Sequence, residues 1–445
     1  MTTDLLSLLD DCIRRARAAG ADAADALAYD SQSLSVSRRL DKPERVERSE
    51  SRDLGLRVFV GQRQAMVSTS ERTPSALADL VERAVSMARA VPEDAFCGLA
   101  DPSQLARSWP ELELADPSEP SPESLMAMTQ EAEASAMAVQ GVTNSEGADA
   151  GWGRSDIALV ASNGFAGCYS RSSWSVSVAV LAGEGTGMER DYDYSSTVFA
   201  SDLRSAADIG RSAGERAVKR LNPRKGPTST LPVVFDPRVS NGFIGALAGA
   251  ISGPSIARGT SFLKDRLGTQ LFAAGINIVD DPFIVRGLRS RPFDGEGVAP
   301  ARRAIVEDGK LTTWFLDLRS ARQLGLVTTG HAARGAGSAP SPSPSNLALM
   351  PGAKSPAELI AEIESGLYVT ELMGMGTNGV TGDYSRGAAG FWIEKGQLAY
   401  PVSEMTVAGN MKDMFPRITP ANDLVRRYGI DAPTIRIDGM TIAGR

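Results

Sequence analysis

The side chains that most often hold a catalytic zinc ion or act as nucleophiles are scarce in this sequence. Its 445 residues include one histidine, His331, and three cysteines, Cys12, Cys97 and Cys168. A single histidine excludes any two-histidine metal site on this chain. Since most zinc hydrolases use two or more imidazole ligands, this excludes most of them. The cysteines are odd in number and tens of residues apart, so they indicate neither a disulfide framework nor a paired metal-binding motif. His331 could act as a general base, but no motif places a nucleophile beside it.

One loop near the C-terminal end, residues 382–387, combines groups that commonly bind ligands. Asp383, Tyr384 and Arg386 supply a carboxylate, a phenol and a guanidinium between two glycines. Loops of this composition often carry binding residues, because the flanking glycines free the backbone. The alternative is a solvated turn, and the residues alone leave both readings open.

Three short motifs match catalytic patterns without the context that each requires. Residues 210–214 read G-x-S-x-G, yet they fall inside a helical pattern rather than at a turn from strand to helix. Residues 261–264 read S-x-x-K without the companion motifs of the serine enzymes that use it. Gly374, Gly376 and Gly379 read G-x-G-x-x-G, but no helix start follows that could face a phosphate. None of the three predicts a catalytic or nucleotide site.

Charge and hydropathy argue against nucleic-acid and membrane binding. Lysine and arginine total 47 against 54 aspartates and glutamates, a net charge of −7 that gives no attraction to DNA or anionic lipid. The most apolar run, residues 242–251, has roughly half the length that a membrane-spanning helix needs. No basic segment leads into an apolar leader, and the cysteines suit a reducing compartment, so we expect a cytoplasmic protein.

Hydrophobic periodicity predicts a helix, an antiparallel meander and a second helix at the start of the chain. Apolar residues recur at helical spacing over residues 4–19 and alternate over 26–70. Thr73 and Pro74 then form an N-cap that starts a helix reaching about residue 90. The proline-rich stretch 92–122 predicts a connector and therefore a domain boundary.

The same order of elements returns after the connector. A helix is expected from Ser121 to Gly141, a strand over residues 174–181 and a helix over 201–221. A duplicated helix–meander–helix unit explains this return, and a chance likeness of two ordinary segments explains it equally well. We predict domains at 1–100, 101–226 and 227–445.

The third domain is predicted to be rich in β-structure, which makes the fold class α+β throughout. Hairpin turns are indicated at residues 307–310 and 395–396. Ser355 and Glu358 form a capping box that starts a helix, which we expect Gly366 to end. The alternating serines and prolines of residues 338–345 predict a low-complexity surface loop without a packed element, whose order the sequence does not decide.

A helix of small residues opens this third domain. Gly245, Gly249 and Gly253 lie four apart, with Gly242, Ala246 and Ala250 on the neighbouring row. Small residues at this spacing allow another backbone to approach closely, so we expect tight packing in the core rather than a ligand site.

Several strings in the C-terminal third closely resemble the PmbA (TldE) branch of the TldD/PmbA family. In chain order they are residues 249–253 (GAISG), 261–263 (SFL), 330–332 (GHA), 370–374 (TELMG), 381–392 (TGDYSRGAAGFW), 400–404 (YPVSE) and 408–410 (AGN). The resemblance is strong over about residues 230–412 and fits the rest in length and element order. The family, historically called modulators of DNA gyrase, is associated with a cytoplasmic peptidase of two related subunits. The resemblance therefore implies a role in proteolysis, namely trimming unfolded peptides, maturing a peptide antibiotic and removing a labile antitoxin.

The resemblance also implies where a metal site would lie. In the TldD-type subunit an H-E-x-x-x-H helix and a later cysteine hold the metal, and the matching positions here are Gly245, Ala246 and Ala250. None of these can bind a cation, and no cysteine follows Cys168. We therefore expect no catalytic residue and no cofactor on this chain, with the metal on a TldD-like partner. Isolated chains could instead form homodimers.

This chain would then line a channel for extended peptide, held by main-chain hydrogen bonds to a strand edge. The candidate peptide-contacting residues are His331, Glu371, Asp383, Tyr384 and Arg386. Two other functions remain open. One is a metal-independent hydrolase that uses Ser212 or Ser385 with His331, and the other is a non-proteolytic interaction protein that modulates DNA gyrase.

Overall fold

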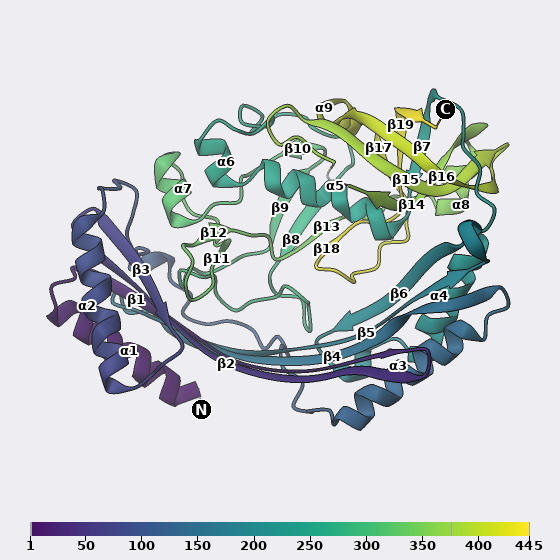
Figure 1. Ribbon diagram of the computed structural model, residues 1–445. Helices are drawn as coiled ribbons and strands as arrows, with labels where there is room; N and C mark the ends of the chain where they lie inside the picture. The colour runs from purple at the N-terminus through teal and green to yellow at the C-terminus, as the bar shows by residue number, and fades with distance from the viewer. Residues whose placement is uncertain (1, 375, 445) are drawn as a thin grey trace.

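A computed structural model describes residues 2–374 and 376–444 of the chain. It has two parts, a long curved sheet with four helices and a β-rich C-terminal domain that lies above the hollow of that sheet (Figure 1). The α+β class predicted from the sequence is confirmed. Within the described residues, no helix is both long and apolar enough to cross a membrane.

The first half of the chain contains the same five-element unit twice. Each unit is a helix, three strands and a helix, as the sequence predicted. The first comprises α1 (Thr2–Ala18), β1 (Ala23–Arg39), β2 (Lys42–Val60), β3 (Arg63–Thr69) and α2 (Pro74–Ala90). The second comprises α3 (Pro122–Met137), β4 (Val142–Ala161), β5 (Ala166–Ala182), β6 (Glu189–Thr197) and α4 (Ala206–Lys219), and three short 3-10 helices lie at Pro102–Gln104, Gly185–Gly187 and Ala200–Asp202.

The two units share one antiparallel sheet of strand order β3-β2-β1-β4-β5-β6. Strand β1 pairs with β4 from Asp25 opposite Ala161 to Arg38 opposite Ala148, which joins the units side by side. The sequence placed a domain boundary between them near residue 100. The connector does lie there, but the hydrogen bonds between β1 and β4 make the sheet continuous across it.

Alternation along the strands decides what each face of this sheet covers. On one face Ala24, Ala26 and Ala28 pack against α1 and α2, and further along the same strand Leu34 faces α3 and α4. On the opposite face Leu27 packs into a cluster with residues of the C-terminal domain. Because successive side chains of a strand point to opposite faces, one sheet supports four helices below and a domain above.

The C-terminal domain contains two further sheets and several short helices. One sheet has the order β16-β15-β14-β7-β19-β17, and an additional pairing of β16 with β19 closes most of it into a barrel-like form. The other has the order β10-β9-β8-β13-β18. The strands are β7 (Ser229–Phe235), β8 (Ile278–Asp281), β9 (Arg303–Glu307), β10 (Lys310–Leu311), β11 (Ala332–Ala333), β12 (Ser341–Pro342), β13 (Asn346–Leu349), β14 (Ser365–Met373), β15 (Asp383–Glu394), β16 (Gln397–Asn410), β17 (Ile418–Pro420), β18 (Ile430–Asp431) and β19 (Ile435–Ala443). The helices are α5 (Pro237–Ala250), α6 (Gly253–Ala257), α7 (Leu318–Gln323), α8 (Pro356–Ala361), α9 (Met411–Met414) and a 3-10 turn at Phe415–Arg417.

Both predicted hairpins of this domain are confirmed. Asp308 and Gly309 have φ angles of 47° and 78°, and they connect β9 to β10. Lys395 and Gly396 have φ angles of 50° and 77°, and they connect β15 to β16. Positive φ at both central residues defines the tight turn that matches the twist of two antiparallel strands.

Two local expectations are wrong. The capping box of Ser355 starts α8 as predicted, but that helix ends at Ala361, and Gly366 lies in β14. A Cβ at Gly366 would be 2.7 Å from the carbonyl oxygen of Pro232, so the glycine allows β7 to approach rather than ending a helix. Residues 338–345, expected to hold no packed element, include β12, which pairs with β11. Ser345 anchors this segment, because its buried hydroxyl donates a hydrogen bond to the carboxylate of Asp280.

Candidate functional site

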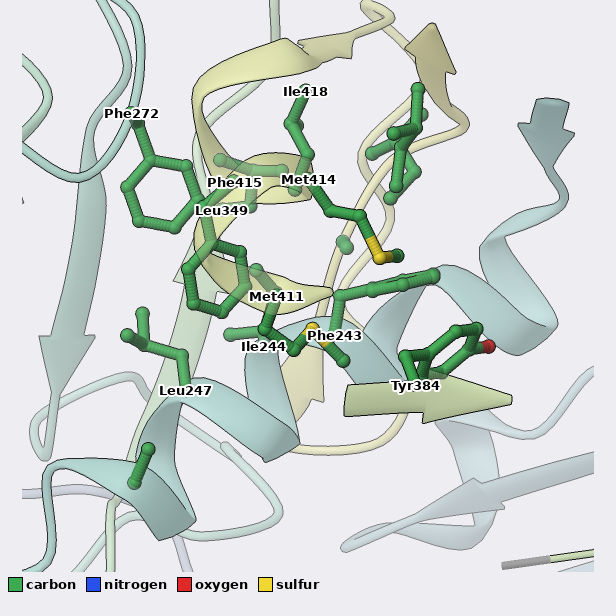
Figure 2. Packing of buried hydrophobic residues seen from close by; sticks show 14 of the residues in the cluster. Phe243, Ile244, Leu247, Phe272, Leu349, Tyr384, Met411, Met414, Phe415 and Ile418 are labelled. Atoms are coloured by element: carbon green, nitrogen blue, oxygen red, sulfur yellow. The ribbon is translucent and has the colours of Figure 1, made fainter. Parts of the chain in front are cut away.

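Helix α5 contains the three positions at which the resemblance described above implies the metal ligands of a TldD-type subunit, and its start is well defined by sequence. Asp236 caps the helix by accepting a hydrogen bond of 3.0 Å from the backbone N–H of Arg238, and Pro237 occupies the first turn. Phe243, Ile244 and Leu247 point into the main core of the C-terminal domain (Figure 2). This apolar side fixes the orientation of the helix.

The other side of α5 is open. Among residues 2–374 and 376–444, no atom lies within 4 Å of a Cβ built at Gly242, Gly245 or Gly249. The predicted close packing of the small-residue row is therefore wrong at these three positions. It holds at Ala246 and Ala250, which pack in the main core, and at Gly253 in α6, where a Cβ would collide with the side chain of Ser320.

The three positions that match the metal ligands of a TldD-type subunit do not fit a metal here. Gly245 and Ala246 lack side-chain donors, and Ala250 is a buried alanine. Within residues 2–374 and 376–444, no three histidine, cysteine, aspartate or glutamate side chains are grouped so that they could hold an ion. Zinc in proteins is held by side-chain nitrogen, sulfur or oxygen atoms, and glycine and alanine at these three positions supply none.

Three of the predicted peptide-contacting residues lie together at the start of β15. Asp383 is exposed, and it accepts hydrogen bonds from the Thr381 hydroxyl at 2.6 Å and the Asn410 amide at 2.9 Å, which lower the pKa of its carboxyl. Tyr384 is buried, with its ring centroid 5.3 Å from that of Phe243 on α5 (Figure 2). Burial raises the pKa of this phenol, whose hydroxyl has no hydrogen-bond partner in the described structure.

Arg386 follows on the same face of β15 as Tyr384, since the two are separated by one residue. Its guanidinium donates a hydrogen bond of 3.2 Å to the carbonyl oxygen of Leu372 on the neighbouring strand. Asp383, by contrast, points to the solvent-facing side. Of the three candidates at the start of β15, Asp383 and Arg386 therefore retain atoms that a bound peptide could reach, and Tyr384 does not.

The other two candidate peptide-contacting residues, His331 and Glu371, lie outside β15. The side chain of His331 is buried in the core, with Nδ1 2.8 Å from the Thr329 hydroxyl and Nε2 3.1 Å from the Asp280 carboxylate. Burial lowers the pKa of His331, and the nearby Asp280 opposes this. Glu371 lies on β14, where its carboxylate is 2.5 Å from the guanidinium of Arg220 at the end of α4. The structure therefore does not bring His331 to the Asp383–Arg386 segment. Glu371 lies closer, on the strand that pairs with β15 and next to Leu372, whose carbonyl accepts from Arg386, but its carboxylate is held by Arg220.

The catalytic motifs weighed from the sequence have structural roles. Ser212 lies within helix α4, as expected for a chance match, and Ser385 is exposed on β15. Neither serine contacts the ring nitrogens of His331, which are engaged by Thr329 and Asp280. Ser261 donates a hydrogen bond of 2.5 Å to the carbonyl oxygen of Ala250 and so secures the end of α5.

A buried charge network that the sequence analysis did not propose lies between the sheet and the C-terminal domain. Asp25 on β1 pairs with Arg57 on β2 and, at 2.7 Å, with Arg334 from the C-terminal domain. Arg57 also contacts Glu296 at 3.3 Å. Burial opposes ionisation of Asp25, but Arg334 and Arg57 hold its pKa below the usual range. One feature of the sequence indicated this network: Arg57 is a charged residue inside an otherwise apolar alternating strand.

Duplicated helix–meander–helix units followed by a β-rich domain define the architecture of a family of metallopeptidases. Residues 24–88 match the PmbA/TldA metallopeptidase domain 1, residues 115–221 the central domain and residues 228–444 the C-terminal domain. The metalloprotease PmbA of Escherichia coli O157:H7 is 38% identical over 426 residues, which cover 95% of this chain and 93% of that protein. A PmbA homologue of Haemophilus influenzae is 36% identical over 414 residues, covering 92% and 90%. The chain belongs to the PmbA/TldD metallopeptidase family.

Solved structures show the same fold. A protein from Bacteroides thetaiotaomicron described as a modulator of DNA gyrase superposes with a TM-score of 0.90 at 28% identity, covering 99% of this chain and 98% of that one. TldE from Thermococcus kodakarensis superposes with a TM-score of 0.87 at 20% identity, covering 98% of this chain and 100% of that one. At that identity, the likeness to TldE concerns the fold alone.

Proposed function

We propose that this chain is the metal-free subunit of a two-subunit cytoplasmic metallopeptidase that degrades unfolded peptides, and that a TldD-like partner binds the metal. The observation that carries the proposal is the absence of donor side chains at Gly245, Ala246 and Ala250 of helix α5, the three ligand positions implied by the resemblance to TldD-type subunits. Water activation by a metal ion then belongs to the partner, and this chain contributes binding surface.

The open side of α5 supports this division of roles. Gly242, Gly245 and Gly249 leave the helix backbone accessible, so a peptide or a partner element can approach closely. Asp383 and Arg386 lie on the strand that contacts α5 through Tyr384, and both can hydrogen-bond main-chain groups. Recognition through main-chain atoms tolerates many side chains and suits an enzyme for unfolded peptides.

Co-purification with a TldD-like chain from the same organism tests the proposal directly. The two chains together should cleave a quenched fluorescent unfolded peptide and contain zinc, whereas this chain alone should do neither. Stoichiometric zinc and cleavage by the isolated chain would overturn the proposal. So would a pair that associates but does not cleave, which is the result expected of a non-proteolytic modulator of DNA gyrase.

A substitution on α5 tests whether its open side has a function, that is, whether it faces either the peptide or the partner. Gly245→Arg places a long side chain where no atom lies within 4 Å, so the fold should persist while cleavage by the pair falls at least tenfold. Ser86→Arg on α2, also an exposed helical position, is the matched control and should leave cleavage unchanged. Equal cleavage by both variants would contradict a functional role for this side of α5.

A further inference from the structure

A cavity of about 440 Å³ lies where the hollow face of the curved sheet meets the C-terminal domain. The sheet contributes Tyr29, Tyr169 and Arg171, and the C-terminal domain contributes Arg289, Arg291 and Arg334, among others. Its size is within the range of small-molecule sites. The cavity lies apart from α5, which does not line it, so the metal-free role proposed above does not account for it.

Four guanidinium groups line this cavity, and three of them have no carboxylate partner. Within the described part of the chain, Arg171, Arg289 and Arg291 form no ion pair and instead contact backbone oxygens and, for Arg289, the Ser343 hydroxyl at 2.8 Å. Arg289 donates to the carbonyl of Pro344 at 3.2 Å, and Arg291 donates to that of Ser343 at 2.6 Å. Arg171 donates similarly to the carbonyl of Leu288. Carbonyl oxygens orient a guanidinium, but they do not neutralise its charge.

Two of these side chains also keep buried donors without partners. The side chain of Arg334 is 2% exposed, and only its Nη1 atom pairs with Asp25, while Nε and Nη2 have no partner. The Nε atom of Arg291 is buried and unpartnered as well. A buried charged donor without an acceptor is destabilising, so such groups normally have a ligand, an ion or a water.

The nearby carboxylates are committed to other donors. Asp294 on the cavity wall accepts hydrogen bonds from the backbone N–H groups of Glu296, Val298 and Ala332, at 2.9 to 3.0 Å. Asp280 behind the wall is held by His331 and Ser345. These carboxylates compensate the positive charge of the arginines only in part: burial and then Arg291 lower the pKa of Arg289, and Asp280 only partly opposes this.

Aromatic rings form the other part of the wall. The ring centroids of Tyr169 and Phe293 lie 5.3 Å apart, and the Tyr29 hydroxyl donates a hydrogen bond of 2.7 Å to the carbonyl of Arg334. A second, serine-lined hollow on the sheet adjoins this cavity and shares Ser155 and Arg171 with it. The cavity thus offers planar apolar surface beside a concentrated positive charge.

We propose that this cavity binds a small organic anion whose phosphate or carboxylate group contacts Arg171, Arg291 and Arg334 while its apolar part lies against Tyr29, Tyr169 and Phe293. Guanidinium groups match the geometry of both oxyanions because they donate two parallel hydrogen bonds. A ligand held from both sides would also fasten the C-terminal domain to the sheet.

Calorimetric titration of the full chain with phenyl phosphate, benzoate and inorganic phosphate tests the proposal. Phenyl phosphate or benzoate should bind at least tenfold more tightly than inorganic phosphate, and the better of the two identifies the preferred oxyanion. Arg171→Gln and Arg291→Gln should each weaken that binding at least tenfold. Arg211→Gln, which removes an exposed guanidinium paired with Asp208, should leave it unchanged.

The proposal is wrong if none of the three probes binds at millimolar concentration, or if folded Arg171→Gln protein binds as the unmodified chain does. Crystals of the unmodified chain soaked with phenyl phosphate give a readout independent of any substitution. Density between Arg171 and Arg291 supports the site, and an empty cavity contradicts it.

Discussion

His331 has a hydrogen-bond partner on each ring nitrogen, and the partners define its state. Asp280 can only accept near neutral pH, so Nε2 carries the proton and donates to it, while Nδ1 lies 2.8 Å from the Thr329 hydroxyl, which also donates to the carbonyl of Leu316 at 3.2 Å. Burial opposes ionisation of Asp280, yet the hydrogen bond from His331 helps to hold the pKa of that carboxyl below its usual range. The one imidazole of the chain therefore stabilises the core rather than serving as a base.

Replacing His331 should lower stability. In His331→Ala the buried carboxylate of Asp280 loses a donor and a cavity opens beside the Phe315 ring, so we expect a loss of about 2–4 kcal/mol. Urea unfolding followed by tryptophan fluorescence measures the change. Ser385→Ala, on the exposed side of β15, is the control and should change stability by less than about 0.5 kcal/mol. A His331→Ala curve that overlays the control would show that the buried pair is not stabilising.

Helix α5 has two faces with opposite demands on side-chain size. Phe243, Ile244 and Leu247 fill the core, whereas a Cβ at any of the three glycines on the other side would meet no atom of the described residues within 4 Å. Glycine in a helix costs roughly 0.5–1 kcal/mol relative to alanine, because it loses more backbone freedom on folding. Three glycines on an open helical face are therefore unfavourable for the isolated chain, which is consistent with a function for the space that they leave.

Gly245→Ala should stabilise the isolated chain. The new methyl group meets no atom within 4 Å, so the expected gain is about 0.5–1 kcal/mol, seen as a higher melting temperature in calorimetry. Gly253→Ala is the contrasting control, because its methyl group would collide with the Ser320 side chain and should destabilise the chain. If Gly245→Ala also destabilises it, the open side of α5 is not open in solution.

Local signals predicted the elements, and non-local contacts decided the rest. The hairpins at Asp308–Gly309 and Lys395–Gly396 and the caps of α2 and α8 depend on neighbouring residues, so the sequence was sufficient for them. The pairing of β1 with β4 spans more than one hundred residues, and no local pattern encodes it. The same limit applies to His331, Glu371 and the arginine cavity, whose surroundings come from distant segments.

At the scale of the whole molecule, charged groups join the sheet to the domain above it. Asp25, Arg57, Arg334 and Glu296 form a buried network whose members come from both parts. Breaking a buried network by removing one partner leaves an uncompensated charge, so these contacts fix one relative position of the two parts. The ion pair between Glu371 and Arg220 also fixes the position of the C-terminal domain relative to the sheet, at the opposite end of the sheet.

Glu296 should make the stability of this junction depend on pH. Burial raises the pKa of Glu296 in the folded chain above its ordinary value, and Arg57 only partly opposes this. The folded state then binds more protons than the unfolded state once the pH exceeds about 4.5, so stability falls as the pH rises through the interval between the two pKa values. Burial also lowers the pKa of His331, and this shift makes stability rise with pH below about pH 6.5. The effect of Glu296 must therefore be isolated by comparing variants.

We expect the difference in unfolding free energy between Glu296→Gln and the unmodified chain to grow in favour of the variant from pH 5 to 8. Glu131→Gln, an exposed control, should follow the unmodified chain throughout, and parallel curves for all three would remove Glu296 as the titrating group.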